Sequence, residues 1–268
     1  MSATILDRIM DRKRAEVAEA RRRISEASLL AECRGASSAR GFANALIKRA
    51  GQRQTAVIAE VKRGSPSKGR IFPEGAVFDP AAIAAGYAAN GACCISCLTD
   101  RDFFMGDGAF VEQIRAQIDL PVLRKDFVYD PYQVAEARFL GADAILLIMA
   151  VLEVSQAREL ESAAGELGLD VLIEVHDEAE LEAAHELKSP LMGINNRDLK
   201  HFVTDLGTTF RLAKRVEAGR LVVSESGIRD AADLNRLHDA DIFAVLIGES
   251  FMKERDPGTA LGRMLGRS

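Results

Sequence analysis

The chain has 268 residues, 48% of them hydrophobic and 28% charged, so it holds enough apolar material for a large core. Its net charge of -5 argues against a nucleic-acid-binding surface, and no segment approaches the ~18 consecutive apolar residues that a membrane span needs. Because the first residues are too charged for a signal peptide, we expect a cytoplasmic protein that binds neither nucleic acid nor membrane.

About fifty residues precede the first strand-like segment, and they show the pattern of charged amphipathic helices. This pattern leaves two interpretations open: a helical cap packed against the rest of the chain, which we favour, or a solvated extension. No Gly/Ser-rich or Pro-rich linker divides the sequence. We therefore predict one domain over residues 1–268, with residues 1–50 as an N-terminal helical extension that caps it.

Eight short apolar segments follow, and each gap between them is long enough for one helix. They begin near positions 55, 92, 120, 143, 169, 190, 220 and 242. Helix starts are marked at Asp79-Pro80, Asp130-Pro131 and Asp256-Pro257, where an acidic N-cap residue precedes a first-turn proline. Eight strand–helix units close into a barrel, so the predicted fold is α/β, a (βα)8 TIM barrel.

The first of these segments, within IAEVKRGSPSKG, carries two charges on one face. With a period of two, Ile58, Glu60 and Lys62 share one side of the strand. Buried charges must be paired, hydrated or facing a ligand, and the segment alone fits an edge strand with a solvated face equally well. In a TIM barrel the active site lies at the carboxyl ends of the strands, which places Glu60 and Lys62 at the barrel mouth.

The same alternation places polar or aromatic side chains at the ends of three other strands. They are Lys125 with Phe127, Glu174 with His176, and Asn195 with Arg197. A structural salt bridge explains any one of these ions, whereas four strands ending in such groups indicate an active site. Lysines and carboxylates side by side stabilise each other's charged forms and supply groups for proton transfer.

The seventh and eighth strands run into small-residue turns, in VVSESGIRD and LIGESFM. These turns bring the backbone N–H groups of Ser226, Gly227, Gly248 and Glu249 to the same mouth. The loops after strands seven and eight are the usual phosphate site of a TIM barrel, although such glycines also serve simply as helix caps. We predict a phosphate site.

The four cysteines are Cys33, Cys93, Cys94 and Cys97. Cys94 and Cys97 form a C-x-x-C motif, but they lie in a predicted strand that points them to opposite faces, which favours buried structural thiols over a redox or zinc motif. The four histidines lack metal-ligand spacing. We expect neither a metal nor an organic cofactor.

Six segments carry a resemblance to a known family: IAEVKRGSPSKG, LRKDFVYDPYQVAEARFLGADAILLI, LIEVHDEAEL, GINNRDLKHFVTDL, VSESGI and LIGESFM. Together they resemble indole-3-glycerol phosphate synthase of tryptophan biosynthesis, and the resemblance covers essentially the whole chain. It implies a small-molecule substrate, 1-(2-carboxyphenylamino)-1-deoxyribulose 5-phosphate. This substrate closes to indole-3-glycerol phosphate and releases carbon dioxide and water.

The resemblance also implies roles for the charged residues. Lys125 would be the general acid at the ketone oxygen, and Glu174 would act in the later dehydration. Lys62 would contact the anionic groups of the substrate and assist proton transfer, with Glu60 orienting the lysines by charge pairing. Glu225 would be a polar member of the pocket or, nearly as well, an ion-pair partner of another residue.

Further residues would shape and fill the pocket. Phe127 would pack on the aromatic ring, Asn195 and Arg197 would sit near the anthranilate moiety, and Ser65 would shape the first loop. Some relatives carry a serine where this chain has Glu249. A phosphate there would be held by the backbone N–H, and the Glu249 carboxylate would have to turn away.

Three rival functions remain open. Phosphoribosylanthranilate isomerase shares the phosphate turns but lacks the E-x-K-x-x-S-P-S-K-G segment and the N-terminal extension. A Schiff-base aldolase would use Lys125 at its strand end as a nucleophile. A non-catalytic phosphate-ligand sensor would not need both Lys125 and Glu174. We expect a monomer or a weak homo-oligomer.

Overall fold

The computed structural model describes residues 4–198 and 203–267; the 199–202 part of the GINNRDLKHFVTDL segment lies outside them. Eight parallel strands close into a barrel in the order β1-β10-β9-β8-β7-β6-β5-β4, which confirms the predicted TIM barrel. The strands are β1 (Ala56–Val61), β4 (Cys94–Leu98), β5 (Val122–Lys125), β6 (Ala144–Ile148), β7 (Asp170–Val175), β8 (Leu191–Asn195), β9 (Leu221–Glu225) and β10 (Ala244–Ile247). A short hairpin of β2 (Gly64–Ser65) and β3 (Gly69–Arg70) follows β1.

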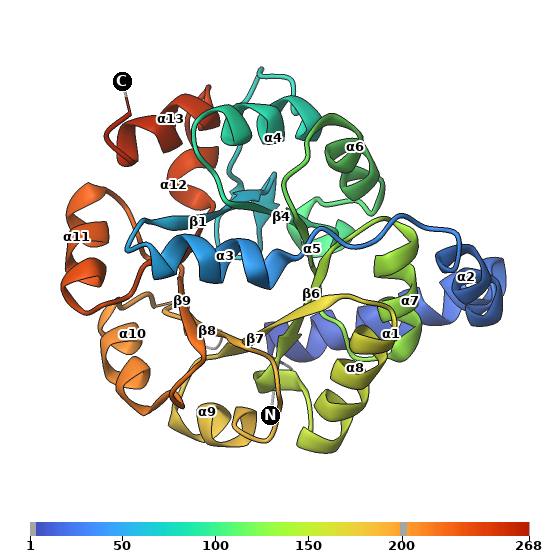
Figure 1. Cartoon of the computed structure of the whole chain (residues 1–268). Coiled ribbons are helices and arrows are strands. Elements are labelled where there is room, and N and C mark those ends of the chain that lie inside the picture. Colours follow the sequence, from blue (N-terminus) through green and yellow to red (C-terminus); the bar gives the residue numbers. More distant parts are fainter. Residues whose placement is uncertain (1–3, 199–202, 268) are drawn as a thin grey trace.

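Helices surround the barrel in an outer ring (Figure 1). They are α4 (Pro80–Ala89), α6 (Ala109–Gln117), α7 (Pro131–Phe139), α8 (Val154–Glu166), α9 (Glu178–Ala184), α10 (Gly207–Leu212), α11 (Ala231–Asp239) and α13 (Pro257–Met264). Two short helices, α5 (Arg101–Phe104) and α12 (Glu249–Met252), follow β4 and β10 directly at the carboxyl ends of these strands. The predicted caps are confirmed, because Asp79, Asp130 and Asp256 each accept a backbone N–H at the start of α4, α7 and α13. Among the described helices, none combines the length and the apolar character that crossing a membrane requires.

The barrel wall separates two apolar clusters, as the alternation along each strand predicts. Ile58 belongs to the cluster inside the barrel, whereas its neighbour Ala59 belongs to the cluster between the strands and the outer helices. Cys94 and Cys97 of β4 divide in the same way, and both are buried free thiols. The prediction that the C-x-x-C motif lies in a strand with its thiols on opposite faces is therefore confirmed.

Three helices precede the barrel: α1 (Ile5–Arg23), α2 (Glu26–Cys33) and α3 (Phe42–Gly51). Helix α3 closes the end of the barrel at which the strands begin, and it crosses the foreground of Figure 1. Phe42 and Leu46 are fully buried in the interior cluster, and the N–H of Ala43 donates to Oδ2 of Asp170 at 2.9 Å, at the start of β7. Apolar packing and this hydrogen bond therefore fix this end of the barrel.

Helix α1 lies at the opposite end, where the strands finish, and in Figure 1 it passes behind the strands. The ammonium of Lys13 on α1 is buried between Asp100, 2.8 Å away, and Asp126, 2.9 Å away. Burial alone would lower the pKa of Lys13, but the two carboxylates outweigh burial and raise it. This buried ion cluster attaches α1 to the loops that follow β4 and β5.

We expect Leu46→Ala to lower the free energy of unfolding by about 2–5 kcal/mol, because it leaves a cavity where α3 enters the barrel. The adjacent Ile47 is 41% exposed, so Ile47→Ala on the same helix is a matched control with an expected effect of about 0.5 kcal/mol or less. Urea unfolding of both variants measures the difference. Equal losses would mean that α3 does not close the barrel through Leu46.

Candidate active site

One cavity of about 490 Å³ opens at the carboxyl ends of the barrel strands. Thirteen residues predicted from the sequence as site members all line it: Glu60, Lys62, Ser65, Lys125, Phe127, Glu174, Asn195, Arg197, Glu225, Ser226, Gly227, Gly248 and Glu249. They come from the carboxyl ends of six barrel strands, β1, β5, β7, β8, β9 and β10, and from the segments that follow these strands. The barrel brings together residues as far apart in the chain as Glu60 and Glu249.

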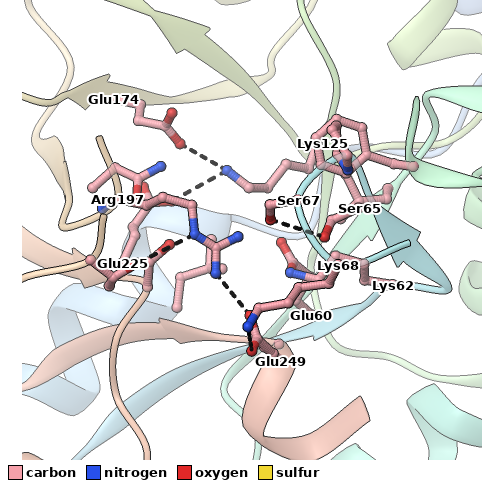
Figure 2. Close-up of a pocket in the computed structure, with 18 of the residues that line it drawn as sticks. Glu60, Lys62, Ser65, Ser67, Lys68, Lys125, Glu174, Arg197, Glu225 and Glu249 are labelled. Carbon is pink, nitrogen blue, oxygen red and sulfur yellow. Dashed lines mark hydrogen bonds and ion pairs between the residues drawn. The ribbon is translucent and has the colours of Figure 1, made fainter. Parts of the chain in front are cut away.

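The ammonium of Lys125 lies between two carboxylates at the bottom of this cavity. Its Nζ is 2.8 Å from Oε2 of Glu174 and 3.2 Å from Oε2 of Glu225, and Figure 2 shows the lysine reaching across between them. Glu174 is 2% exposed and Glu225 1% exposed, so water screens little of this interaction. Three strands, β5, β7 and β9, thus end in one coupled ion cluster.

Burial and the neighbouring charges shift the pKa values of Lys125, Glu174 and Glu225. Burial would lower the pKa of Lys125, but Glu174 and Glu225 outweigh it and raise this pKa. Burial would raise the pKa of Glu174, yet Lys125 and His176 pull it well below its ordinary value. For Glu225 burial prevails: together with the neighbouring charge of Glu174 it raises the pKa to about 8, against the pull of Lys125. The directions of these shifts favour an ionised Glu174 and a protonated Glu225.

A second pair, Glu60 and Lys62, lies at the end of β1. Their side chains meet at 2.5 Å between Oε1 and Nζ. Gly248, at the end of β10, leaves the room for this pair, because a Cβ at that position would overlap with the carboxylate of Glu60. The glycine predicted to admit a phosphate is thus also required by the packing of Glu60.

The two small-residue turns form one wall of the cavity, and cationic side chains lie beside them. Nη2 of Arg197 lies 2.8 Å from Oε2 of Glu249, and Nζ of Lys68 lies 3.9 Å from the other oxygen of Glu249 (Figure 2). The Glu249 carboxylate therefore lines the cavity with its charge balanced. Ser226, in the other turn, has a φ of 62°, a left-handed conformation that is uncommon outside glycine.

Apolar side chains cover the opposite wall. The rings of Phe104 and Phe127 lie 6.1 Å apart, and Ile5, Leu6 and Ile9 of α1 face the same space. An aromatic ring of a ligand would find matching surface here. The cavity thus has an aromatic side under α1 and a cationic side at the glycine turns.

Residues 6–264 match the family model described as indole-3-glycerol phosphate synthase. The chain belongs to this family. It is 64% identical over 263 residues to an indole-3-glycerol phosphate synthase of Magnetococcus marinus, with 98% of each chain covered. It is 49% identical over 261 residues to that of Bordetella pertussis, with 97% of this chain and 98% of the relative covered. It is therefore a carboxy-lyase of tryptophan biosynthesis.

Solved structures with little sequence identity share the fold. Tryptophan synthase subunit alpha from Legionella pneumophila superposes with a TM-score of 0.58 at 15% identity, covering 85% of this chain and 96% of its own. KGPDC from Streptococcus mutans gives a TM-score of 0.58 at 12% identity, covering 79% of this chain and 96% of its own. At such identities the likeness shows the barrel alone.

Several residues that line the cavity were not predicted as site members. They include Lys68, Thr204, Phe104 and the apolar residues of α1. The spacing of Ile5, Leu6 and Ile9 marks an apolar helix face, but it does not say which surface that face covers. Within residues 4–198 and 203–267, no group of three or more His, Cys, Asp or Glu side chains is arranged to hold a metal ion.

The raised pKa of Glu225 predicts a pH dependence of stability. The folded protein keeps this proton up to about pH 8, whereas an unfolded glutamate loses it near 4.5. This proton contributes to the free energy of unfolding. Its contribution is complete below pH 4.5, decreases by ~1.4 kcal/mol for each pH unit above that, and is lost above pH 8. Glu225→Gln should remove this decrease, as urea unfolding at pH 5, 6 and 7 will measure.

Glu182→Gln is the matched control, because the Glu182 side chain is 73% exposed. We expect this variant to keep the pH dependence of the wild type. If Glu225→Gln also kept it, Glu225 would be ionised at neutral pH.

Proposed function

We propose that this protein converts 1-(2-carboxyphenylamino)-1-deoxyribulose 5-phosphate into indole-3-glycerol phosphate, with Lys125 at the reacting centre. The observation that carries the proposal is the position of Lys125, whose ammonium lies between Glu174 and Glu225 in the cavity. Ring closure needs a cation at the ketone oxygen and a carboxylate nearby for later proton transfer. This cluster supplies both.

The first step forms a bond between the aromatic carbon that carries the carboxylate and the ketone carbon. Negative charge then develops on the ketone oxygen. Lys125, kept protonated by its carboxylate neighbours, stabilises this charge and delivers a proton to it. The substrate carboxylate leaves as carbon dioxide, and its bonding electrons return to the ring.

Dehydration follows: the new hydroxyl group takes a proton from Lys62 and leaves as water, and a proton leaves the neighbouring ring carbon. We assign the ionised Glu174 to accept that proton. Glu225 holds a proton of its own near neutral pH, so it can donate a hydrogen bond where Glu174 can only accept one. The two carboxylates thus serve opposite purposes, although both contact Lys125.

The substrate would extend from the aromatic wall to the glycine turns. Phe127 and Phe104 support an anthranilate ring on one side, with Asn195 nearby on the cavity wall. The family resemblance placed Arg197 near the anthranilate, but its contact with Glu249 supports a place beside the phosphate. The phosphate would then lie between the turns, with Arg197 and Lys68 within reach.

The charge state of Lys125 argues against a Schiff-base aldolase. A lysine that forms a Schiff base must be a neutral amine, and such lysines have lowered pKa values. Glu174 and Glu225 raise the pKa of Lys125 instead. This favours acid and electrostatic chemistry over covalent catalysis.

For the quaternary state we propose a monomer or a weak homo-oligomer in the cytoplasm. Within the described residues, the exposed large hydrophobic side chains are Ile47, Val77, Met105, Phe139 and Val203. They come from five separate segments of the chain, and scattered apolar residues do not mark an extensive interface.

We expect Lys125→Ala to lower kcat by about 10²-fold or more, because the positioned acid and its charge are both lost. Fluorescence of the indole product measures the turnover. Lys214→Ala, which replaces an exposed lysine, should behave as the wild type. Borohydride added during turnover should trap no adduct on the wild-type protein. Near-normal kcat in Lys125→Ala would move the acid to Lys62, and a trapped adduct would favour the aldolase.

The phosphate site predicts opposite effects of two substitutions. Inorganic phosphate should compete with the substrate in the wild type. Arg197→Met should raise KM about tenfold and weaken this competition, because a cation at the anion site is lost. Glu249→Gln should strengthen it, because Arg197 and Lys68 lose the carboxylate that neutralises them. Steady-state kinetics at several phosphate concentrations measure both effects.

Two further variants complete this experiment. Arg211→Met removes an exposed arginine that pairs with Glu178, so it should change neither KM nor the competition. Ser226→Ala should have little effect, because its backbone N–H remains. Gly248→Asp is unsuitable, since its side chain would also displace Glu60. Competition that persists unchanged in Arg197→Met would place the phosphate elsewhere.

A further inference from the structure

The imidazole of His176 lies directly beside Glu174, although His176 is not among the residues that line the cavity. His176 is the first residue after β7, two positions beyond Glu174, and its side chain is 10% exposed. Its Nε2 is 3.3 Å from Oε1 of Glu174, whereas Lys125 contacts the other oxygen, Oε2. Each oxygen of this buried carboxylate therefore faces a different nitrogen.

A second carboxylate fixes the orientation of this imidazole. Oε2 of Glu180, on α9, accepts hydrogen bonds from the backbone N–H of His176 at 2.8 Å and from its Nδ1 at 2.9 Å. Glu180 is itself held at the start of α9, where its N–H donates to Oδ1 of Asp177. With Nδ1 bound to Glu180, Nε2 lies within ion-pair distance of Glu174, although the angle is not that of a hydrogen bond.

The charges around the ring favour the doubly protonated imidazolium. Glu174 faces it from β7 and Glu180 from α9, while Lys125 of β5 and Glu225 of β9 act on it through Glu174. Strands β6 and β8, which flank β7, contain no ionisable side chain. Burial would lower the pKa of His176, but the two carboxylates outweigh it and raise this pKa to about 10.

We propose that His176 is a positioning residue of this site: its ring, held by Glu180, fixes the carboxylate of Glu174 through the oxygen that Lys125 leaves free. The inference rests on the proposed function in that Glu174 is the group that takes a proton during dehydration. His176 does not line the cavity, so it acts on the reaction through Glu174.

A role through Glu174 has a distinct kinetic signature. Without the imidazolium, Oε1 of Glu174 loses its partner in a dry environment and its carboxylate is free to turn. The pKa of Glu174 then rises, so the acid limb of the kcat profile moves to higher pH. Substrate binding involves other groups, so KM changes little.

The main test uses His176→Gln in the full chain, which keeps an N–H donor but removes the charge. We expect kcat to fall about tenfold or more, KM to stay within about twofold, and the acid limb of kcat to move up by about one pH unit. His185→Gln is the matched control, because His185 also lies near a glutamate, 3.9 Å from Glu182, but outside the cavity region. It should keep the wild-type profile.

Glu180→Gln is a second variant that leaves the histidine in place. Losing this carboxylate lowers the pKa of His176, so kcat should now fall on the alkaline side, below pH 9, where the wild type is still active. Carbon-13 NMR titration of the glutamate carboxyl groups in the free protein should show Glu174 titrating at higher pH in His176→Gln. This readout needs neither substrate nor turnover.

These outcomes separate the inference from the proposed function. If the wild type forms no indole product, the proposed function fails, whereas the NMR shift of Glu174 still tests the contact with His176. Wild-type kcat and an unmoved acid limb in His176→Gln would overturn the inference. So would a loss confined to thermal stability, or a Glu180→Gln variant with an unchanged alkaline limb.

Discussion

The ion cluster around the ammonium of Lys125 is the interaction on which the site depends, because a cation that is largely shielded from water must have partners or be neutralised. Glu174 and Glu225 satisfy it, but two carboxylates this close cannot both be ionised cheaply, so Glu225 retains a proton. The carboxyl ends of β5, β7 and β9 must therefore lie at the same level along the barrel axis, so that the three side chains meet. Gly193 on β8 leaves room for this cluster because it has no side chain: a Cβ there would overlap with the carboxylate of Glu225.

Strand periodicity accounts for most of what the sequence could predict. Alternation placed Ile58 inside the barrel and Ala59 outside it, and it brought Glu60, Lys125 and Glu174 to one mouth before any contact was known. These predictions succeeded because a strand has only two faces. The pairing of Arg197 with Glu249 lies beyond such reasoning, since it depends on the conformation of two long side chains 52 residues apart.

The N-terminal extension shows a different limit. Amphipathic spacing correctly indicated helices with one apolar face, but such a face does not identify the surface it covers. Here α3 closes the end where the strands begin, whereas α1 lies at the active-site end. Both belong to the same interior cluster, which runs from Leu46 through Leu172 to Ile9. The extension is thus bound to both ends of one apolar column, a consequence of chain topology rather than of local pattern.

The two ends of that column are held by different forces. At α3 the contacts are mainly apolar side chains, which are easily desolvated, and this suits an end that contributes stability. At α1, Lys13 is buried against Asp100 and Asp126, and Asp126 directly follows Lys125 in the chain. A buried ion pair contributes little net stability, but removing one of its two residues is strongly destabilising. Such a pair therefore favours a single position of α1. Because Asp126 is next to Lys125, this ion cluster connects α1, which covers the cavity, to the strand β5 that carries Lys125. A displacement of α1 would therefore also disturb the segment that holds Lys125.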